Sequence, residues 1–482
     1  KGRSCLGEFK LHLAASIDRS IEKSSKDQEP FAAWHCLPSC HTHAIDMLRY
    51  VFATGSNRFF VSITMTNVYS PLFAPLTLPN GSVLSNRICR AAMDSVLADA
   101  NHAPGSRQIR LYQRWAEGGV GLIITGSVMI DRHALSSPGS ALLDSDRYLP
   151  QFAKWARVCR SRGAQVWMQL GHPGRQMLAS MGNSACAPSA IPLQLPETGM
   201  EFATPRAMTE AEISEVIASF ARSALLAQRA GFDGVQIDAG HGHLLSQFLS
   251  PLSNQRDDQW GGCLANRARL LLDCVKAVRG QVKPGFCVSV KLNCSDFIAG
   301  GFGGNEAAQL IGMLNPLGLD LLEITGGTYA SPAMFGLPAD HTALPLEGYF
   351  LPQAQTLLAA AQMPLQLTGG IRSRAGAETA LQQGMAMVGL ATALAQQPDL
   401  PLRWQAGESL QPDSATQADG TPPSAVALLM QTTERLGQMA AGRQPRSAIS
   451  PQLAMLSSQI RLRNLSSRYR QWLTRQEASN PR

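Results

Sequence analysis

The chain of 482 residues is long enough for one large domain with flanking segments. Hydrophobic residues make up 45% and charged residues 16%, which is ordinary for a soluble enzyme. No apolar stretch is long enough to cross a bilayer, so we expect no membrane span. The formal net charge of +7 is modest for this length and does not indicate a nucleic acid partner.

The ten cysteines are scattered, without the tight spacing of an iron–sulfur ligand run or a secreted disulfide framework. This usage indicates a reducing, cytoplasmic setting. One dense cluster of thiols and imidazoles could in principle gather a zinc ion; it consists of His35, Cys36, Cys40, His41 and His43. Because no second ligand pair follows at finger spacing, we expect no metal site.

Residues 1–66 are predicted to form an N-terminal extension of unknown role. The segment opens on Lys1 and alternates charged and apolar patches without a steady period. Acidic residues such as Glu8 and Asp18 argue against a transit peptide, and a signal-peptide core is lacking. An upstream extension, a fusion scar and an incorrectly chosen start all stay open.

Over residues 67–405, short β-rich apolar runs alternate with longer stretches of helical period. Eight strands are predicted at Ile88–Met93, Gly121–Val128, Gln165–Leu170, Gly234–Asp238, Cys287–Asn293, Leu319–Thr325, Leu365–Thr368 and Met385–Leu390. Helices are predicted between them at Gln108–Glu117, Leu149–Arg160, Glu210–Arg229, Ala265–Val278 and Arg374–Gln383. Thr209 and Glu212 are spaced as a capping box for the third helix. The pattern favours a (β/α)8 TIM barrel. A Rossmann domain would need a glycine fingerprint after its first strand, and the sequence has none there.

Residues 406–482 are predicted to form a linker and a C-terminal helical segment, with two or three helices from Pro422 to Trp472. The last helix interleaves arginines with aromatic residues, namely Arg461, Arg463, Arg468, Arg470, Tyr469 and Trp472. Such a mixture occurs at nucleic acid and membrane surfaces. Since barrel enzymes often append helices, we interpret it as a solvated or subunit-facing helix, and a homo-oligomer stays open.

Polar residues finish several predicted strands, at the end of the barrel where chemistry occurs. They are Gln169 and His172 at the third strand, Asp238, His241 and His243 at the fourth, and Lys291, Asn293 and Asp296 at the fifth. The glycine pairs Gly326–Gly327 and Gly369–Gly370 close the sixth and seventh strands. Backbone amides at such pairs can approach a phosphate, although a glycine pair can also simply turn the chain. Together with the lysine and glutamine, the pairs indicate a phosphorylated cofactor.

Four motifs at these strand ends resemble the old yellow enzyme family, the NADH:flavin oxidoreductases. They are GFDGVQIDAGHGHLLSQFLSPLSNQRDDQWGG from Gly231, WMQLGHPGRQ from Trp167, VKLNCSDF from Val290 and LTGGIRSRAG from Leu367. The resemblance runs from Tyr69 to Trp404 and is closest to a bacterial and fungal subgroup that lacks the iron–sulfur and second flavin domain. It implies a noncovalently held FMN across the barrel mouth and NADH or NADPH as electron donor.

The resemblance also implies roles for individual residues around FMN. Gln169 would contact the pyrimidine edge, and Lys291 would place a positive charge near N1 and O2. Such a cation favours hydride acceptance, because the reduced flavin carries negative charge around N1. Further positions would line the ring, at Ala92, Met93 and Ser127, or cradle the phosphate, at Gly369, Gly370 and Gly389.

The sequence departs from the family at the residues that anchor substrate. The family pattern His, Ala, Ala, His, Gly, Tyr is replaced by Asp238, Ala239, Gly240, His241, Gly242 and His243. An ionised Asp238 can accept a hydrogen bond but cannot donate one. Three alternatives therefore stay open: Asp238 is protonated, it orients His241, or ene-reduction is weaker than in the family. His243 can still donate a proton near neutral pH, or it only packs beneath the loop.

Two further departures concern FMN itself. Thr392 stands where the family has an arginine that clamps the phosphate, a loss of about 1.5 to 3 kcal/mol of binding unless Arg372 or Arg374 substitutes. Asp94 stands where some relatives carry a cysteine that tunes the flavin potential.

These features predict reduction of activated alkenes, meaning α,β-unsaturated carbonyl or nitro compounds, through hydride transfer from flavin N5. His241 would polarise the carbonyl, and His243 or water would supply the proton. Two alternatives remain: a flavin-binding relative with weak or no ene-reductase activity, and a Schiff-base aldolase that uses Lys291 as nucleophile.

Overall fold

The computed structural model describes residues 46–54, 57–65, 70–195, 200–412, 424–446 and 450–479. The chain divides into two compact units, Lys1–Tyr69 and Ser70–Arg482. In the first unit, β1 (Asp46–Thr54) and β2 (Asn57–Met65) form an antiparallel hairpin. The cluster of thiols and imidazoles between His35 and His43 lies outside the described residues.

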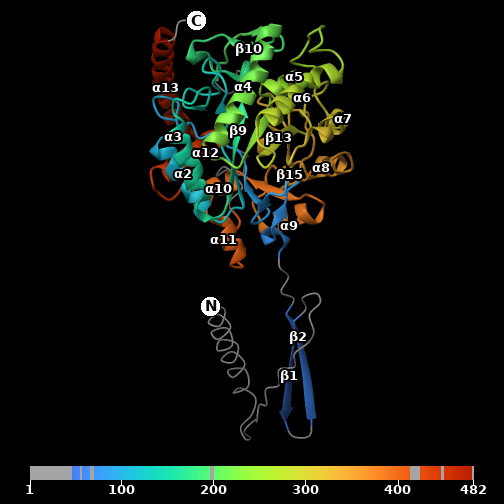
Figure 1. Cartoon of the computed structure of the whole chain (residues 1–482). Coiled ribbons are helices and arrows are strands. Elements are labelled where there is room, and N and C mark those ends of the chain that lie inside the picture. Colours follow the sequence, from blue (N-terminus) through green and yellow to red (C-terminus); the bar gives the residue numbers. More distant parts are fainter. Residues whose placement is uncertain are drawn as a thin grey trace. The chain divides into compact units, whose positions relative to one another are not determined.

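The second unit is a closed barrel of eight parallel strands (Figure 1). The strands are β5 (Ile88–Arg90), β6 (Leu122–Ile124), β9 (Gln165–Gly171), β12 (Gly234–Ala239), β13 (Cys287–Asn293), β14 (Leu321–Thr325), β15 (Leu365–Thr368) and β16 (Met387–Leu390). Pairing of β9 with β12 and of β16 with β5 completes the ring. The predicted (β/α)8 barrel is therefore confirmed. Two short strands, β7 (Val128–Met129) and β8 (Ala141–Leu142), extend the sheet beside β9.

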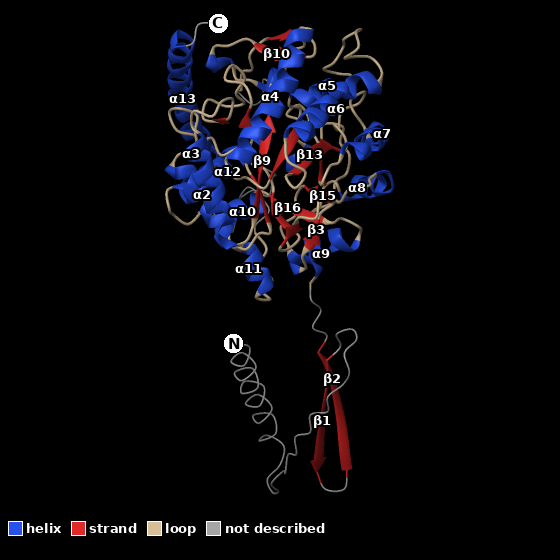
Figure 2. Ribbon diagram, viewed as in Figure 1, coloured by secondary structure: helices blue, strands red, loops and turns tan. Residues whose placement is uncertain are grey.

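Helices surround the strands, as Figure 2 shows. They are α2 (Ser106–Glu117), α3 (Leu149–Cys159), α4 (Glu210–Arg229), α5 (Leu244–Leu249), α6 (Leu264–Gln281), α7 (Gly304–Leu314), α8 (Leu351–Leu357), α9 (Arg374–Gln382), α10 (Thr392–Gln396) and α11 (Leu400–Gln405). The predicted capping box of α4 is present, since the Thr209 side chain accepts from the Glu212 amide and the Glu212 side chain accepts from the Thr209 amide. The five helices predicted from periodicity match α2, α3, α4, α6 and α9 to within a few residues.

Apolar side chains fill the end of the barrel where the strands begin. This interior cluster includes the first residues of several strands, among them Leu122, Cys287, Leu321 and Met387. The short hairpin of β3 (Leu76–Thr77) and β4 (Val83–Leu84) adds Leu84, which is fully buried. Because this end is packed with apolar groups, polar groups can gather inside the barrel only toward the opposite end.

Two helices, α12 (Ala425–Ala440) and α13 (Pro451–Ser479), follow the barrel. The aromatic face of α13 packs on the loops of its own barrel: Tyr469 and Trp472 contact His102, and the Tyr469 hydroxyl donates to the Arg132 carbonyl over 2.9 Å. The aromatic face of α13 is therefore an intramolecular contact, while the rest of the helix is largely exposed, as expected of a solvated helix, and includes exposed arginines such as Arg463. Among the described residues, no helix combines the length and hydropathy needed to cross a bilayer.

Candidate active site

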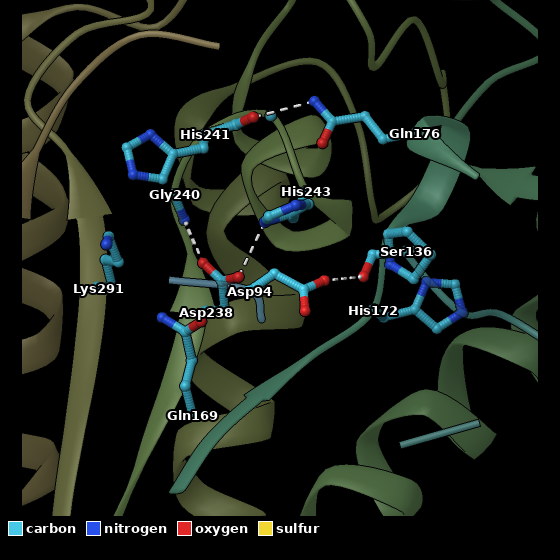
Figure 3. Close-up of polar contacts among 12 residues, drawn as sticks. Asp94, Ser136, Gln169, His172, Gln176, Asp238, Gly240, His241, His243 and Lys291 are labelled. Carbon is cyan, nitrogen blue, oxygen red and sulfur yellow. Dashed lines mark hydrogen bonds and ion pairs between the residues drawn. The ribbon is translucent and has the colours of Figure 1, made fainter. Parts of the chain in front are cut away.

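Three ionisable side chains lie side by side on neighbouring strands of the barrel, and Figure 3 shows two of them, Asp238 and Lys291. Asp238 of β12 pairs in register with Lys291 of β13, which pairs with Glu323 of β14. Residues in register on parallel strands point to the same face of the sheet. Their exposed fractions are 2%, 3% and 0%. Buried charges of this kind require partners, and each of the three has one.

The partner of Asp238 is His243. One carboxylate oxygen lies 2.8 Å from Nδ1 of His243, and the other accepts from the Gly240 amide over 3.2 Å. Burial opposes ionisation of this carboxyl group, but the His243 imidazole and the Lys291 ammonium outweigh burial and hold its pKa below the ordinary value. Asp238 is therefore an ionised acceptor. It contacts His243, whereas orientation of His241 was one of the three alternatives that the sequence left open.

His241 is held by its backbone rather than by Asp238. Its φ of +53° is left-handed, its amide donates to Asn293 over 3.0 Å, and its carbonyl accepts from Gln176 over 2.9 Å. Burial, followed by the Lys291 ammonium, lowers the pKa of its imidazole to about 3. His241 is therefore neutral near pH 7 and carries one N–H that can donate to a substrate oxygen. Its Nε2 lies 3.5 Å from the Thr325 hydroxyl.

Two other groups at the mouth were not assigned from the sequence. His172 is buried, accepts from the Gly174 amide over 3.1 Å, and has its pKa lowered to about 4 by burial. The Tyr329 ring lies 6.3 Å from the His243 ring, centroid to centroid. Burial, with the carboxylates of Asp94 and Asp238, raises the pKa of Tyr329 to about 12. The position of Tyr329, just after the glycine pair that closes β14, is the signal that could have found it.

A buried chain of polar contacts links Gln169 to Lys291. The Gln169 amide donates to Gln236 over 2.8 Å, Gln236 donates to Glu323 over 2.8 Å, and Glu323 lies 3.1 Å from the Lys291 ammonium. Sequence analysis selected the two ends of this chain and missed Gln236 and Glu323. Both are polar residues inside short apolar strands, and the twofold alternation of a strand places Gln236 on the same face as Asp238.

The predicted ring-lining residues lie in loops beside these strands. Ala92 and Met93 follow β5, which ends at Arg90, so the first predicted strand was too long. Ser127 lies between β6 and β7, and its buried hydroxyl has no hydrogen-bond partner among the described residues. An orphaned buried hydroxyl is expected where a bound group would complete the contact.

The predicted phosphate-cradling glycines lie in tight surroundings, with Gly369 and Gly370 directly after β15 and Gly389 within β16. Gly370 has a φ of +70°, which side chains rarely adopt. A Cβ on Gly389 would lie 1.9 Å from the Thr368 hydroxyl, and Cβ atoms on Gly369 and Gly370 would collide with aromatic rings. Glycine is thus required at all three positions, as expected where backbone amides approach a phosphate.

The residues present fit FMN. The Ser127 hydroxyl is unsatisfied, the Gln169 amide and Lys291 ammonium lie near the mouth, and the glycines allow close backbone approach. Within the described residues, no group of three or more metal-ligating side chains is gathered.

Comparison with known proteins identifies the family. The profile of the NADH:flavin oxidoreductase / NADH oxidase family matches residues 71–411. The chain belongs to this family. It is 36% identical over 349 residues to the NADH-dependent flavin oxidoreductase iliE of Hypocrea jecorina (strain QM6a), covering 68% of this chain and 87% of that protein. It is also 32% identical over 332 residues to the NADPH dehydrogenase of Geobacillus sp. (strain WCH70), covering 68% and 92%.

The fold agrees with solved structures of old yellow enzyme homologues. The Zymomonas mobilis homologue superposes with a TM-score of 0.61 at 24% identity, covering 72% of this chain and 98% of that one. By its family, the chain is an NAD(P)H:flavin oxidoreductase with FMN as cofactor and NADH or NADPH as donor.

The old yellow enzyme resemblance implied an arginine at the FMN phosphate, where this chain has Thr392, and left Arg372 and Arg374 as possible substitutes. Arg372 lies 3.5 Å from Glu347 and donates to a backbone carbonyl. Arg374 lies 2.8 Å from Glu378 and donates to the Trp404 carbonyl. Both candidate substitutes are engaged elsewhere, so neither replaces the clamp without losing these contacts.

Asp94 also has local partners in this member of the family. Its carboxylate accepts from the Val96 amide over 3.1 Å and from the hydroxyls of Ser136 and Ser140 over 3.2 and 3.3 Å. These contacts fix the loop after β5, which carries Ala92 and Met93.

Proposed function

We propose that this flavin oxidoreductase reduces alkenes activated by a conjugated carbonyl or nitro group, using NADH or NADPH. The observation that carries the proposal is the Asp238–His243 pair, with 2.8 Å between carboxylate and Nδ1. FMN, when bound, supplies the chemistry of accepting a hydride from the nicotinamide and passing it to the alkene. The protein must then supply a proton to the α carbon and stabilise the developing charge on the conjugated oxygen.

His243 is suited to deliver that proton. Its Nδ1 faces the Asp238 carboxylate, so its Nε2 remains for the substrate, and its side chain is 16% exposed while Asp238 is nearly inaccessible. A carboxylate at Nδ1 fixes the orientation of the ring, so that Nε2 can be aimed at the substrate. Asp238 thereby acts through His243 and need not touch substrate, which avoids repulsion of an enolate.

His241 would bind the substrate oxygen. Its neutral imidazole offers an N–H, and its backbone is fixed by Asn293 and Gln176. Preorganised donors aimed at a developing oxyanion lower the barrier without reorganisation at the moment of reaction.

The Schiff-base alternative is disfavoured by the surroundings of Lys291. Its nitrogen is buried and lies 3.1 Å from the Glu323 carboxylate. A substrate carbonyl would have to displace this ion pair to reach the nitrogen. The contact favours an electrostatic role for the lysine over a nucleophilic one.

The test is NADPH and NADH oxidation by the FMN-loaded protein with 2-cyclohexenone, N-ethylmaleimide and a nitroalkene as acceptors, with product identified by mass. We expect saturated products. His243→Asn should slow their formation, whereas His341→Asn, at an exposed histidine whose φ of +58° suits asparagine, should not. A protein that retains FMN and oxidises NADPH with oxygen but forms no saturated product from any acceptor would refute the proposal.

A further inference from the structure

Glu323 has no role in the chemistry described so far, yet it is the most enclosed charged group at the site. It lies on β14 with 0% exposure. One carboxylate oxygen lies 3.1 Å from Lys291, and the other accepts from Gln236 over 2.8 Å. A buried carboxylate is costly unless both oxygens are engaged, and here they are engaged by two residues of different strands.

The carboxylate dictates the direction of the neighbouring amides. An ionised carboxylate only accepts, so Gln236 must turn its NH2 group toward Glu323. The Gln236 carbonyl oxygen then faces Gln169 and accepts from it over 2.8 Å. One N–H of Gln169 is thereby consumed, which leaves its carbonyl oxygen and its second N–H for a ligand at the mouth.

The carboxylate also moderates the charge of Lys291. Asp238 stands beside this lysine in register on β12, and Glu323 stands beside it on β14. Two carboxylates thus flank one ammonium inside the barrel. The positive charge that the family resemblance places at the flavin is partly compensated in this chain.

We propose that Glu323 is a positioning residue of the flavin site, which restrains Lys291 and, through Gln236, sets the amide orientation of Gln169. The inference rests on the FMN-contacting roles proposed for Lys291 and Gln169. Beyond those roles, Glu323 tunes the relative affinity of the site for oxidised and reduced flavin.

The test is the FMN affinity and midpoint potential of Glu323→Gln in the full-length holoprotein. Removal of the Glu323 carboxylate leaves only Asp238 to compensate the Lys291 charge, and the larger net positive charge favours the anionic reduced flavin. We expect reduced FMN to gain about tenfold in affinity relative to oxidised FMN, since a contact to a charged group is worth about that much. Tenfold corresponds to a positive shift of about 30 mV for a two-electron couple.

Two matched variants separate charge from packing. Gln236→Leu removes the link to Gln169 and keeps the Lys291–Glu323 pair. The affinities for oxidised and reduced FMN should therefore fall by the same factor, and the midpoint potential should stay unchanged. Gln366→Leu alters a fully buried residue in register with Glu323 on β15 and should leave the potential unchanged. A purely structural role for Glu323 would lower stability in all three variants without a selective change in potential.

An unchanged potential in folded, FMN-bound Glu323→Gln would overturn the inference. If that variant does not fold, Glu323→Asp retains the charge but is one methylene too short to keep both contacts. It should shift the potential in the same direction by a smaller amount, and an unchanged potential there would also overturn the inference. These measurements need no alkene, so they fail or succeed separately from the proposed ene-reduction.

Discussion

Asp238→Asn gives the sharpest test of how the site handles protons. The substitution preserves the size of the side chain and removes the charge that faces Nδ1 of His243 at 2.8 Å. Because Asp238 is only 2% exposed, water cannot replace the lost interaction. A hydrogen bond to a charged group is worth about 1.5 to 3 kcal/mol, so proton delivery should slow about 10- to 150-fold.

The two half-reactions distinguish this effect from a general disturbance. In rapid mixing, reduction of the bound flavin by NADPH should be unchanged or faster, since a negative charge near the flavin is removed. Oxidation of the reduced protein by 2-cyclohexenone should carry the whole loss, because only that step needs a proton.

Asp233→Asn is the matched control. Asp233 precedes the same strand β12 and contacts the Val166 amide and Arg160 at the opposite end of the barrel. It should leave both half-reactions unchanged. Equal losses in the two half-reactions of Asp238→Asn, or no loss in either, would refute the role of the pair in proton delivery.

Three further predictions concern acid stability, cofactor affinity and the substrate anchor. The folded state keeps His172 neutral with a pKa of about 4, whereas the unfolded chain binds a proton near pH 6.5, so stability should fall as the pH drops between these values. Between pH 7 and pH 5, the free energy of unfolding of His172→Gln should fall by about 1.4 kcal/mol less per pH unit than that of the unsubstituted protein, as measured by urea unfolding at pH 7, 6 and 5. An equal pH dependence of the two proteins would contradict this. Thr392→Arg should tighten FMN by about 10- to 150-fold in a fluorescence titration, and no gain would mean that the phosphate lies elsewhere. Asp238→His combined with His243→Tyr, which restores the family pattern, should raise enone turnover; unchanged kinetics would show that the pair does not limit the rate.

The strands and helices of the barrel could be predicted because each is a local pattern. Apolar runs of strand length, amphipathic stretches and the capping box at Thr209 each depend on residues close in sequence. Errors occurred at ends, as at β5, where the chain leaves the ladder at Arg90 although Ala92 and Met93 continue the apolar run. Hydrogen bonding to the neighbouring strands decides such ends, and a single segment does not contain that information.

The packing of α13 could not be predicted for a related reason. The mixture of arginine and aromatic residues near Tyr469 fits a solvated surface, a subunit interface or an intramolecular contact equally well. The structure shows an intramolecular contact, because His102 and the Arg132 carbonyl lie against the aromatic face of the helix.

The sequence by itself determined the (β/α)8 fold and the set of polar residues at its strand ends, because strand and helix periods and the order of motifs are local properties. The tertiary structure decided which of these groups meet. Asp238 reaches His243 and not His241, because the left-handed backbone at His241 anchors that residue to Asn293. Glu323 meets Lys291 only because barrel closure brings the interior faces of separate strands together, and no spacing along the chain records that contact.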